Sequence, residues 1–158
     1  MPEVAISTDI IVGFVGEEEE DHHDTLQLLR DVRFDFIYSF LYSPRPLSPA
    51  AGWEETVPRE EKSRRLLEVN ALQAEIQMER QRGCVGALTE VLVDGTSRRD
   101  PREACGWTPQ WRVVNFPGDP AALHGRLVPV RITEARMNSL RGILALPASP
   151  EEPASALR

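Results

Sequence analysis

The chain has 158 residues, with 18 lysines and arginines against 25 aspartates and glutamates, for a formal charge of −7. With 41% hydrophobic and 27% charged residues, its composition is that of a globular protein and excludes collagen-like and largely disordered chains. Its 2 cysteines are too few for a disulfide scaffold or for a metal site built on three or four thiolates. No apolar run reaches the roughly 20 residues of a membrane span, and no signal peptide is visible, so we expect a cytoplasmic protein without a membrane partner.

The charge is distributed unevenly along the chain. Residues 1–82 carry 17 acidic and 9 basic side chains, whereas residues 83–158 carry 8 and 9. Because an acidic surface repels phosphate, only the second half is expected to bind nucleic acid unaided. Arginine supplies 17 of the 18 basic residues, and arginine pairs with phosphate and stacks on bases, although a GC-rich genome would produce the same bias.

The first half begins with a pattern typical of a βαβ unit. Apolar, β-branched or aromatic runs at 4–12 and 34–42 predict two strands buried on both faces. Between them, acids in a first helical turn and leucines at spacings of three predict a helix over about 18–32. Two parallel strands need neighbours and a closed β/α barrel takes roughly 200 residues, so residues 1–82 are predicted to be the last part of a larger β/α layer.

A proline-rich loop and a long helix complete the first half. The three prolines of 43–49 exclude regular structure, and this loop follows the second strand at the sheet edge where ligands bind. A helix is predicted from Pro58 to Arg82, with an apolar face formed by Leu66, Val69, Leu72 and Ile76. Gly83 ends it.

Beyond Cys84 the hydrophobic period changes to two. Alternation around Val91, 113–116 and 128–132, with a last strand at 139–146, predicts four or five short strands. Asp94-Gly95 is a turn signal. Short strands separated by glycine and proline predict a small antiparallel barrel over residues 83–146, and the Pro/Ala/Glu-rich residues 147–158 are predicted to be a disordered tail.

Several segments resemble a known family. They are Thr8–Glu17 (TDIIVGFVGE), Tyr42–Ala51 (YSPRPLSPAA), Val57-Pro58, Glu90–Val93 (EVLV), Arg98–Asp100 (RRD), Arg112–Gly118 (RVVNFPG) and Ser139–Gly142 (SLRG). In this order they resemble the C-terminal part of radical-SAM tRNA methylthiotransferases of the 2-methylthio-isopentenyladenosine synthase type. The resemblance implies an α+β chain in two parts: the C-terminal β/α segment of a radical-SAM barrel, followed by an OB-like TRAM barrel that binds RNA.

The same resemblance implies an activity and its cofactors. Such enzymes add a 2-methylthio group to isopentenyladenosine next to the tRNA anticodon, using S-adenosylmethionine and two [4Fe–4S] clusters, each held by three cysteines. This chain contains neither cysteine triad, so by itself it is catalytically incomplete, and its expected partners are tRNA and the missing N-terminal part of the enzyme. Alternative interpretations are a stand-alone TRAM-type RNA-binding module without catalytic activity and a non-functional remnant. Threonylcarbamoylated adenosine stays open as the substrate.

The resemblance also suggests cofactor-binding residues at the sheet edge: Ile11, Gly13, Gly16 and Arg45. The two glycines would let the backbone approach S-adenosylmethionine, or they simply end a strand. Arg45 would contact the cofactor carboxylate or a tRNA phosphate, or else form a salt bridge to the acidic helix. Glu17–Asp21 with the two following histidines is interpreted as a solvated helix start, and no metal site is predicted. Where the family usually has glycine, Leu47 removes a position that tolerates positive φ.

The RNA-binding candidates lie in the predicted barrel: Arg98, Arg99, Trp107, Thr108, Trp111, Arg112, Asn115 and Arg141. The family pattern places arginines near Trp107 and Pro109 and a small polar residue near Trp111. Losing two cations weakens phosphate attraction, whereas stacking one base on an aromatic ring is worth about 1–3 kcal/mol. We therefore expect RNA binding to depend on stacking and to vary only weakly with salt.

Overall fold

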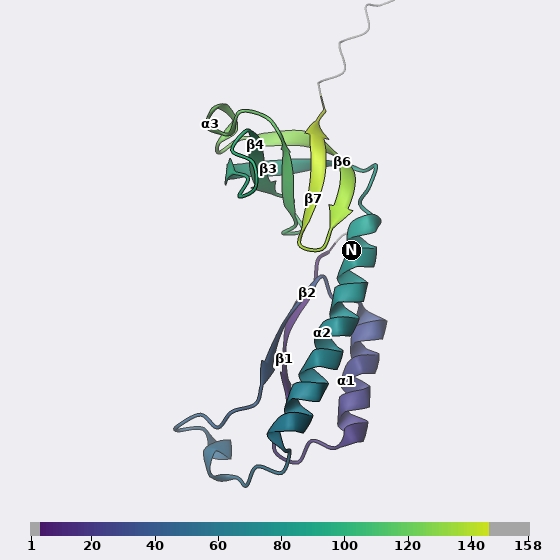
Figure 1. The fold of residues 1–158 in the computed structure, drawn as a ribbon, viewed down its shortest axis with the longest axis vertical. Helices are drawn as coiled ribbons and strands as arrows, with labels where there is room; N and C mark the ends of the chain where they lie inside the picture. The colour runs from purple at the N-terminus through teal and green to yellow at the C-terminus, as the bar shows by residue number, and fades with distance from the viewer. Residues whose placement is uncertain (1–3, 146–158) are drawn as a thin grey trace, which may run out of the picture. The chain divides into compact units, whose positions relative to one another are not determined.

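A computed structural model describes residues 4–145 (Figure 1). The chain divides into two compact units, the first ending at Gly83 and the second beginning at Cys84. Within the described residues no helix has the length and apolar character to cross a membrane, and the tail predicted at 147–158 lies outside them. In chain order the elements are β1 (Ser7–Val12), α1 (Glu19–Val32), β2 (Phe36–Leu41), the 3-10 helix η1 (Pro49–Gly52), α2 (Arg59–Arg82), β3 (Leu88–Thr96), β4 (Glu103–Trp107), β5 (Val113–Pro117), α3 (Pro120–Leu123), β6 (Leu127–Arg136) and β7 (Ser139–Leu144).

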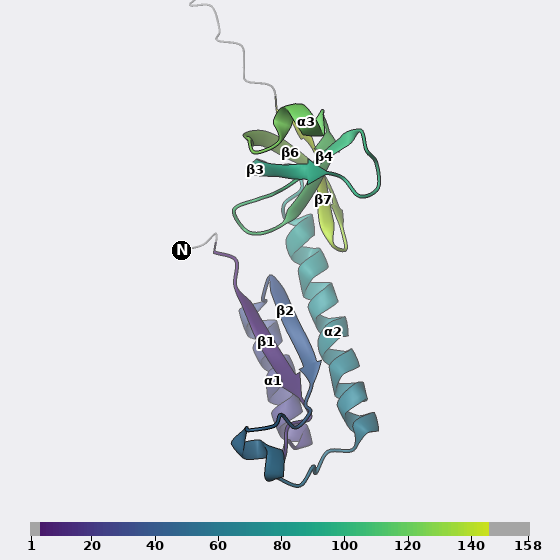
Figure 2. The ribbon, with the colours of Figure 1, turned by 90° about the vertical axis from the view of Figure 1, so that its left-hand side faces the viewer.

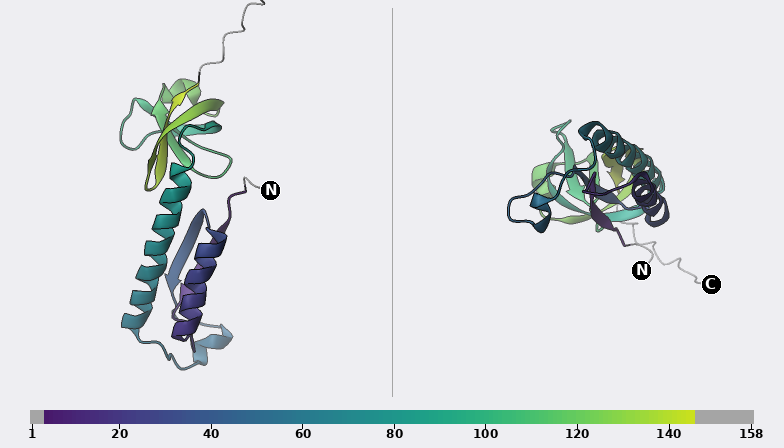
Figure 3. Two further views of the ribbon diagram at one scale, coloured as in Figure 1. Left: turned by 90° about the vertical axis from the view of Figure 1, so that its right-hand side faces the viewer. Right: turned by 90° about the horizontal axis from the view of Figure 1, so that it is seen from below.

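The first unit is built on one parallel strand pair. β1 and β2 pair in register from Ser7 opposite Phe36 to Val12 opposite Leu41, which confirms the predicted parallel βαβ unit. Figure 2 views the two strands with α1 behind them, and Figure 3 shows α1 and α2 side by side. Both helices pack on the same face of the pair, where Leu26 and Leu29 of α1 and Val69 and Ile76 of α2 share one core with β1.

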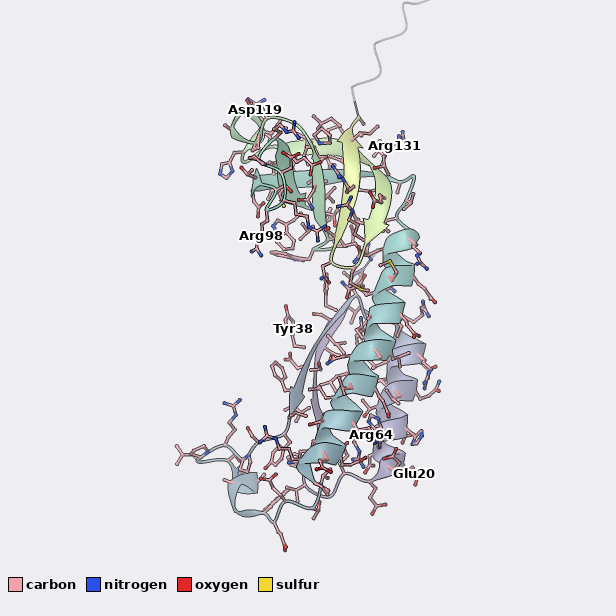
Figure 4. All side chains as sticks on the ribbon, in the orientation of Figure 1. Glu20, Tyr38, Arg64, Arg98, Asp119 and Arg131 are labelled. Carbon is pink, nitrogen blue, oxygen red and sulfur yellow. The ribbon has the colours of Figure 1, made fainter. Side chains whose placement is uncertain are left out.

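The prediction that both strands are buried on both faces is wrong. Ile10 and Val12 lie in the core beneath the helices. On the opposite face Ile11, Tyr38 and Phe40 are 56%, 62% and 52% exposed. Figure 4 shows Tyr38 projecting from the side of the sheet away from the helices. The two strands have the sequence pattern of strands buried on both faces, but within the described residues helices pack on only one face.

Ion pairs join the start of α1 to α2. Arg64 bonds to Glu19 and Glu61, and Arg65 bonds to Glu17, Glu19 and Glu61. The carboxylate of Glu17 is only 13% exposed. The interpretation of Glu17–Asp21 as a solvated helix start is therefore wrong only for Glu17, because Arg65 pairs with it; the other four acids are exposed, as predicted.

The second unit is a closed five-stranded barrel in the order β3-β4-β5-β7-β6, with β6 pairing back to β3. Its core contains Val91, Val114, Phe116, Val130 and Leu140, all at most 1% exposed. The predicted antiparallel barrel is correct except for one pair, since β5 and β7 run parallel. The exception arises because the barrel closes with an odd number of strands: when the other four neighbouring pairs are antiparallel, the fifth pair has to be parallel.

One local prediction in the barrel is wrong, and one strand was missed. Asp94-Gly95 is not a turn, because β3 continues to Thr96 and the pair lies at a register shift between Val93 and Gly95. Such a bulge bends a strand, as barrel closure requires. The sequence analysis also missed β4, because Glu103, Ala104 and Gly106 belong to residue types that are depleted in strands. A Cβ on its Gly106 would lie 2.7 Å from a methyl of Val91, so close packing of the barrel requires glycine there.

Candidate functional site

The loops that follow β1 and β2 meet at one edge of the sheet in the first unit. The backbone N–H of Gly16 donates to Thr56 Oγ1 at 2.8 Å. The Phe14 ring lies with its centroid 4.8 Å from that of Tyr42 and 6.0 Å from that of Trp53. Since parallel strands end at the same edge, this arrangement places the four candidate cofactor residues at the carboxyl end of the sheet.

A neighbouring side chain leaves no room for a Cβ atom at Gly13. Gly13 is buried with φ at +74°, and a Cβ there would lie 2.7 Å from Lys62 Cδ and closer still to Cγ. Lys62, the only lysine of the chain, is 4% exposed, and its Nζ bonds to Glu55 and to the Tyr42 carbonyl. The space beside Gly13 is thus filled by the protein itself, whereas Gly16, at φ +81°, faces open space.

Glu17 and Arg65 organise the loop after β1, and the sequence analysis missed this role. Glu17 Oε2 accepts the backbone N–H groups of Gly13 at 2.7 Å and Phe14 at 3.2 Å. Its Oε1 accepts Arg65 Nη1 at 2.8 Å. Burial lowers the pKa of Arg65, but hydrogen bonds to Glu17 and Glu61 outweigh it, so the net shift is upward. The guanidinium therefore stays charged and holds the loop.

The other two cofactor candidates are open to solvent. Ile11 lies on the bare face of the sheet, and Arg45 is exposed in the proline-rich loop. The expected salt bridge between Arg45 and the acidic helix is not formed, since no ion pair among residues 4–145 involves Arg45. Glu17 and Glu19, near the start of α1, are paired with Arg64 and Arg65 instead.

The clusters of the resembling family do not fit the residues present. The described part of the chain contains no group of three histidine, cysteine, aspartate or glutamate side chains that could hold a metal ion. His22 Nε2 lies 2.8 Å from Glu68 Oε2, and His23 bonds to the Glu19 carbonyl. With 2 cysteines in the whole sequence, neither cysteine triad can be supplied by this chain.

Strand register brings several RNA-binding candidates onto one side of the barrel. Cys105 on β4 lies opposite Asn115 on β5, which in turn lies opposite Arg141 on β7. Trp107 is two residues along β4 from Cys105 and therefore faces the same way. We call this outer surface, defined by Trp107, Asn115 and Arg141, the β4–β5–β7 face.

The turn between β4 and β5 holds three further candidates. Trp111 is 67% exposed and has a left-handed backbone with φ at +57°. Thr108 is buried, and its hydroxyl accepts the Arg112 N–H at 3.2 Å while its carbonyl accepts the Trp111 N–H at 3.0 Å. Thr108 thus shapes the turn. Trp107 and Trp111 lie with ring centroids 5.4 Å apart in an edge-to-face arrangement.

The four candidate arginines of the barrel differ in their surroundings. Arg98 and Arg99 are exposed in the β3–β4 loop and form no ion pair within the described residues, and Figure 4 shows Arg98 extending from the barrel. Arg141 forms an ion pair with Glu103, and Arg112 Nη1 lies 3.4 Å from Cys84 Sγ. The first two arginines are therefore the ones most readily available to an anion.

The closed barrel is similar to a known domain family. Residues 82–145, which contain all five strands of this barrel, match the family model of the TRAM domain. Over nearly its whole length the chain is similar to enzymes named tRNA-2-methylthio-N(6)-dimethylallyladenosine synthase. It is 46% identical to that of Syntrophobacter fumaroxidans over 143 residues, which cover 90% of this chain and 31% of the relative.

Two further relatives give the same result. The chain is 49% identical to the Alkalilimnicola ehrlichii enzyme of this name over 146 residues, covering 90% of this chain and 32% of the relative. It is 46% identical to the Bordetella pertussis enzyme over 144 residues, covering 91% and 32%. The predicted resemblance to the C-terminal, TRAM-containing part of tRNA methylthiotransferases is confirmed, and the chain spans about a third of the length of these relatives.

Proposed function

We propose that the chain serves as the C-terminal part of a tRNA methylthiotransferase that adds a 2-methylthio group to isopentenyladenosine beside the anticodon. The observation that carries this proposal is the extent of the match, which runs through both units and covers 90% of the chain at 46% identity. A match confined to the barrel would support RNA binding alone. The tRNA substrate also implies a cytoplasmic location.

The first unit, residues 1–82, is proposed to complete a radical-SAM β/α barrel. The bare apolar face of β1 and β2 supports this role, because an uncovered patch of large apolar side chains marks a surface that another element buries. Ile11, Gly16 and Arg45 would contact S-adenosylmethionine, which supplies the radical chemistry when bound. The iron–sulfur clusters would be held by residues outside this chain.

The second unit, residues 83–146, is proposed to bind the tRNA. Arg98, Arg99, Arg112 and Arg141 would contact phosphates, and Asn115 would hydrogen-bond to the RNA from the β4–β5–β7 face. Trp107 and Trp111 would offer aromatic surface to the bases. Thr108 would act indirectly, because its hydroxyl is engaged in the turn that carries Trp111.

A stand-alone RNA-binding module is the second candidate function. It is favoured by the closed barrel, which has its own apolar core and carries all the proposed RNA contacts. To separate the two functions, the chain would be produced together with the N-terminal two-thirds of the Syntrophobacter relative, and tRNA nucleosides would be analysed by mass spectrometry. Appearance of the 2-methylthio nucleoside only when both parts are present supports the enzyme, and its absence with RNA binding intact supports the module.

RNA binding itself is tested by fluorescence anisotropy with a labelled anticodon stem-loop between 50 and 300 mM salt. We count only Arg98 and Arg99 as full phosphate contacts, because Arg141 is paired with Glu103 and Arg112 lies against Cys84. The logarithm of the association constant should then fall with log salt at a slope of about −1.4 to −1.8. Replacing Arg98 and Arg99 by glutamine lowers the affinity and flattens the slope. Arg30→Gln/Arg59→Gln, which removes the same charge from the first unit, is the matched control. No binding at 50 mM salt would contradict the proposed RNA-binding role.

A further inference from the structure

The exposed indole of Trp111 is held in a strained turn. Its φ of +57° is a conformation that costs a non-glycine residue about 1–3 kcal/mol. The turn persists because Thr108 accepts backbone hydrogen bonds from both Trp111 and Arg112 and donates its own N–H to the Arg112 carbonyl at 3.0 Å. Strain enforced in this way concentrates at ligand sites, where it fixes a contact group in advance.

A second indole supports the first. Trp107 meets Trp111 at an interplanar angle of 62°, and its Nε1 donates to Asp94 Oδ2 at 2.6 Å. Asp94 lies in the β3 bulge, which accounts for its position next to the β4 indole. Because Trp107 is held by this hydrogen bond and by its strand, Trp111 rests against a fixed ring while 67% of its own surface stays open.

The surroundings of the two indoles indicate what would cover them. Along the strand register Trp107 lies opposite Leu92, which lies opposite Leu127, and both leucines are exposed. Burial and the charge of Asp94 raise the pKa of the Cys105 thiol, two residues from Trp107, and the charge of Arg98 opposes them, so Arg98 also lies near this strand. The exposed ring of Trp111, with exposed leucines and an unpaired arginine nearby, fits a nucleobase with its attached phosphate. Only an unpaired base has a free face to offer, because duplex stacking covers the others.

We propose that Trp111, supported by Trp107, is a stacking platform for one unpaired base of the bound RNA. This inference rests on the proposed RNA-binding function and identifies the part of the RNA that the barrel contacts: a single-stranded loop. Asp94 and Thr108 are positioning residues, which act by holding the two indoles. Since stacking involves no net charge, its contribution does not depend on salt.

The test compares the full chain with Trp111→Ala, Trp111→Phe and the matched control Trp53→Ala, which removes an exposed tryptophan of the first unit. Affinity for a labelled anticodon stem-loop is measured at 50 and 300 mM salt, alongside a fully paired stem of equal length. We expect Trp111→Ala to weaken loop binding about 5- to 150-fold by the same factor at both salt concentrations. Trp111→Phe retains most of the affinity, and neither Trp53→Ala nor the paired stem shows the effect.

A second comparison tests the positioning role. Asparagine can still accept the indole N–H, so Asp94→Asn retains loop affinity, whereas Asp94→Ala loses part of it. In the Trp111→Ala background Asp94→Ala has no further effect. A parent chain and a Trp111→Ala variant that bind the loop equally well would overturn the platform and leave the proposed function intact. A parent chain that binds no RNA would overturn both, and Trp111-dependent self-association without an RNA effect would assign the indole to a protein contact.

Discussion

The substitution Gly13→Ala tests whether Gly13 is required by internal packing or by a ligand. The added methyl group meets two penalties in the structure. A left-handed backbone, here at φ +74°, costs an L-residue about 1–2 kcal/mol. Forcing a methyl group into the stem of Lys62 adds an overpacking cost of about 1–3 kcal/mol, because the lysine is pinned at its Nζ by Glu55 and Tyr42. Together they predict a loss of about 2–5 kcal/mol.

Hydrogen exchange read by mass spectrometry is the suitable assay, since it reports each unit separately. Gly13→Ala should reduce amide protection in β1 and β2 by about 30-fold or more, since 1.4 kcal/mol corresponds to a factor of ten. The barrel strands, with their separate core, serve as the internal control and keep their protection.

Lys62→Ala supplies the partner for a double-mutant cycle. It removes the Cγ and Cδ atoms, which the new methyl group would meet most closely, and leaves Cβ at 3.1 Å; the backbone conformation of Gly13 stays unchanged. In this background Gly13→Ala should cost only the backbone penalty of about 1–2 kcal/mol. If Gly13→Ala left the protection of β1 and β2 unchanged, or if Lys62→Ala recovered nothing, the packing explanation of this glycine would be refuted.

Three further changes follow from local features. Leu47 is fully exposed at φ +71°, so Leu47→Gly should stabilise the protein by about 0.5–1 kcal/mol in urea unfolding, and destabilisation would contradict the backbone argument. A hydrogen bond from Arg64 lowers the pKa of Glu61 to about 2, so this carboxylate stabilises the fold above its usual pKa of 4.5 and loses the effect as the pH falls towards 2. Glu61→Gln should accordingly lower Tm at pH 7 and match the parent at pH 2, and an equal deficit at both pH values would argue against the ion pair. Burial and then the charge of Asp94 raise the pKa of Cys105, so Asp94→Asn should speed alkylation of this thiol at pH 8 in a Cys84→Ala background. An unchanged alkylation rate would show that the carboxylate does not influence the thiol.

The uncovered face of β1 and β2 links the fold to the proposed function. Burial of Ile11, Tyr38 and Phe40 would be favourable, since fully covering a large apolar side chain stabilises a protein by about 1.5–3 kcal/mol. A partner layer packing on this face would therefore stabilise the first unit. We expect protection of β1 and β2 to increase when the N-terminal part of a relative is present.

Local sequence determined most elements of the structure. Runs of β-branched and aromatic residues predicted β1 and β2, and acids followed by leucines at helical spacing predicted α1. The stripe from Leu66 to Ile76 predicted α2, of which Val69 and Ile76 are buried. These patterns succeed because each one records, residue by residue, which side of an element faces the core.

Sequence by itself also indicated the resemblance to tRNA methylthiotransferases, because that resemblance depends on short motifs and on their order along the chain. Tertiary structure decided what those residues contact. Gly13 faces Lys62, Glu17 holds the loop through Arg65, and Asp94 lies in a bulge beside Trp107 rather than in a turn. Each of these pairs is separated by at least 13 positions along the chain, and no local pattern encodes a contact that only strand register and helix packing bring together.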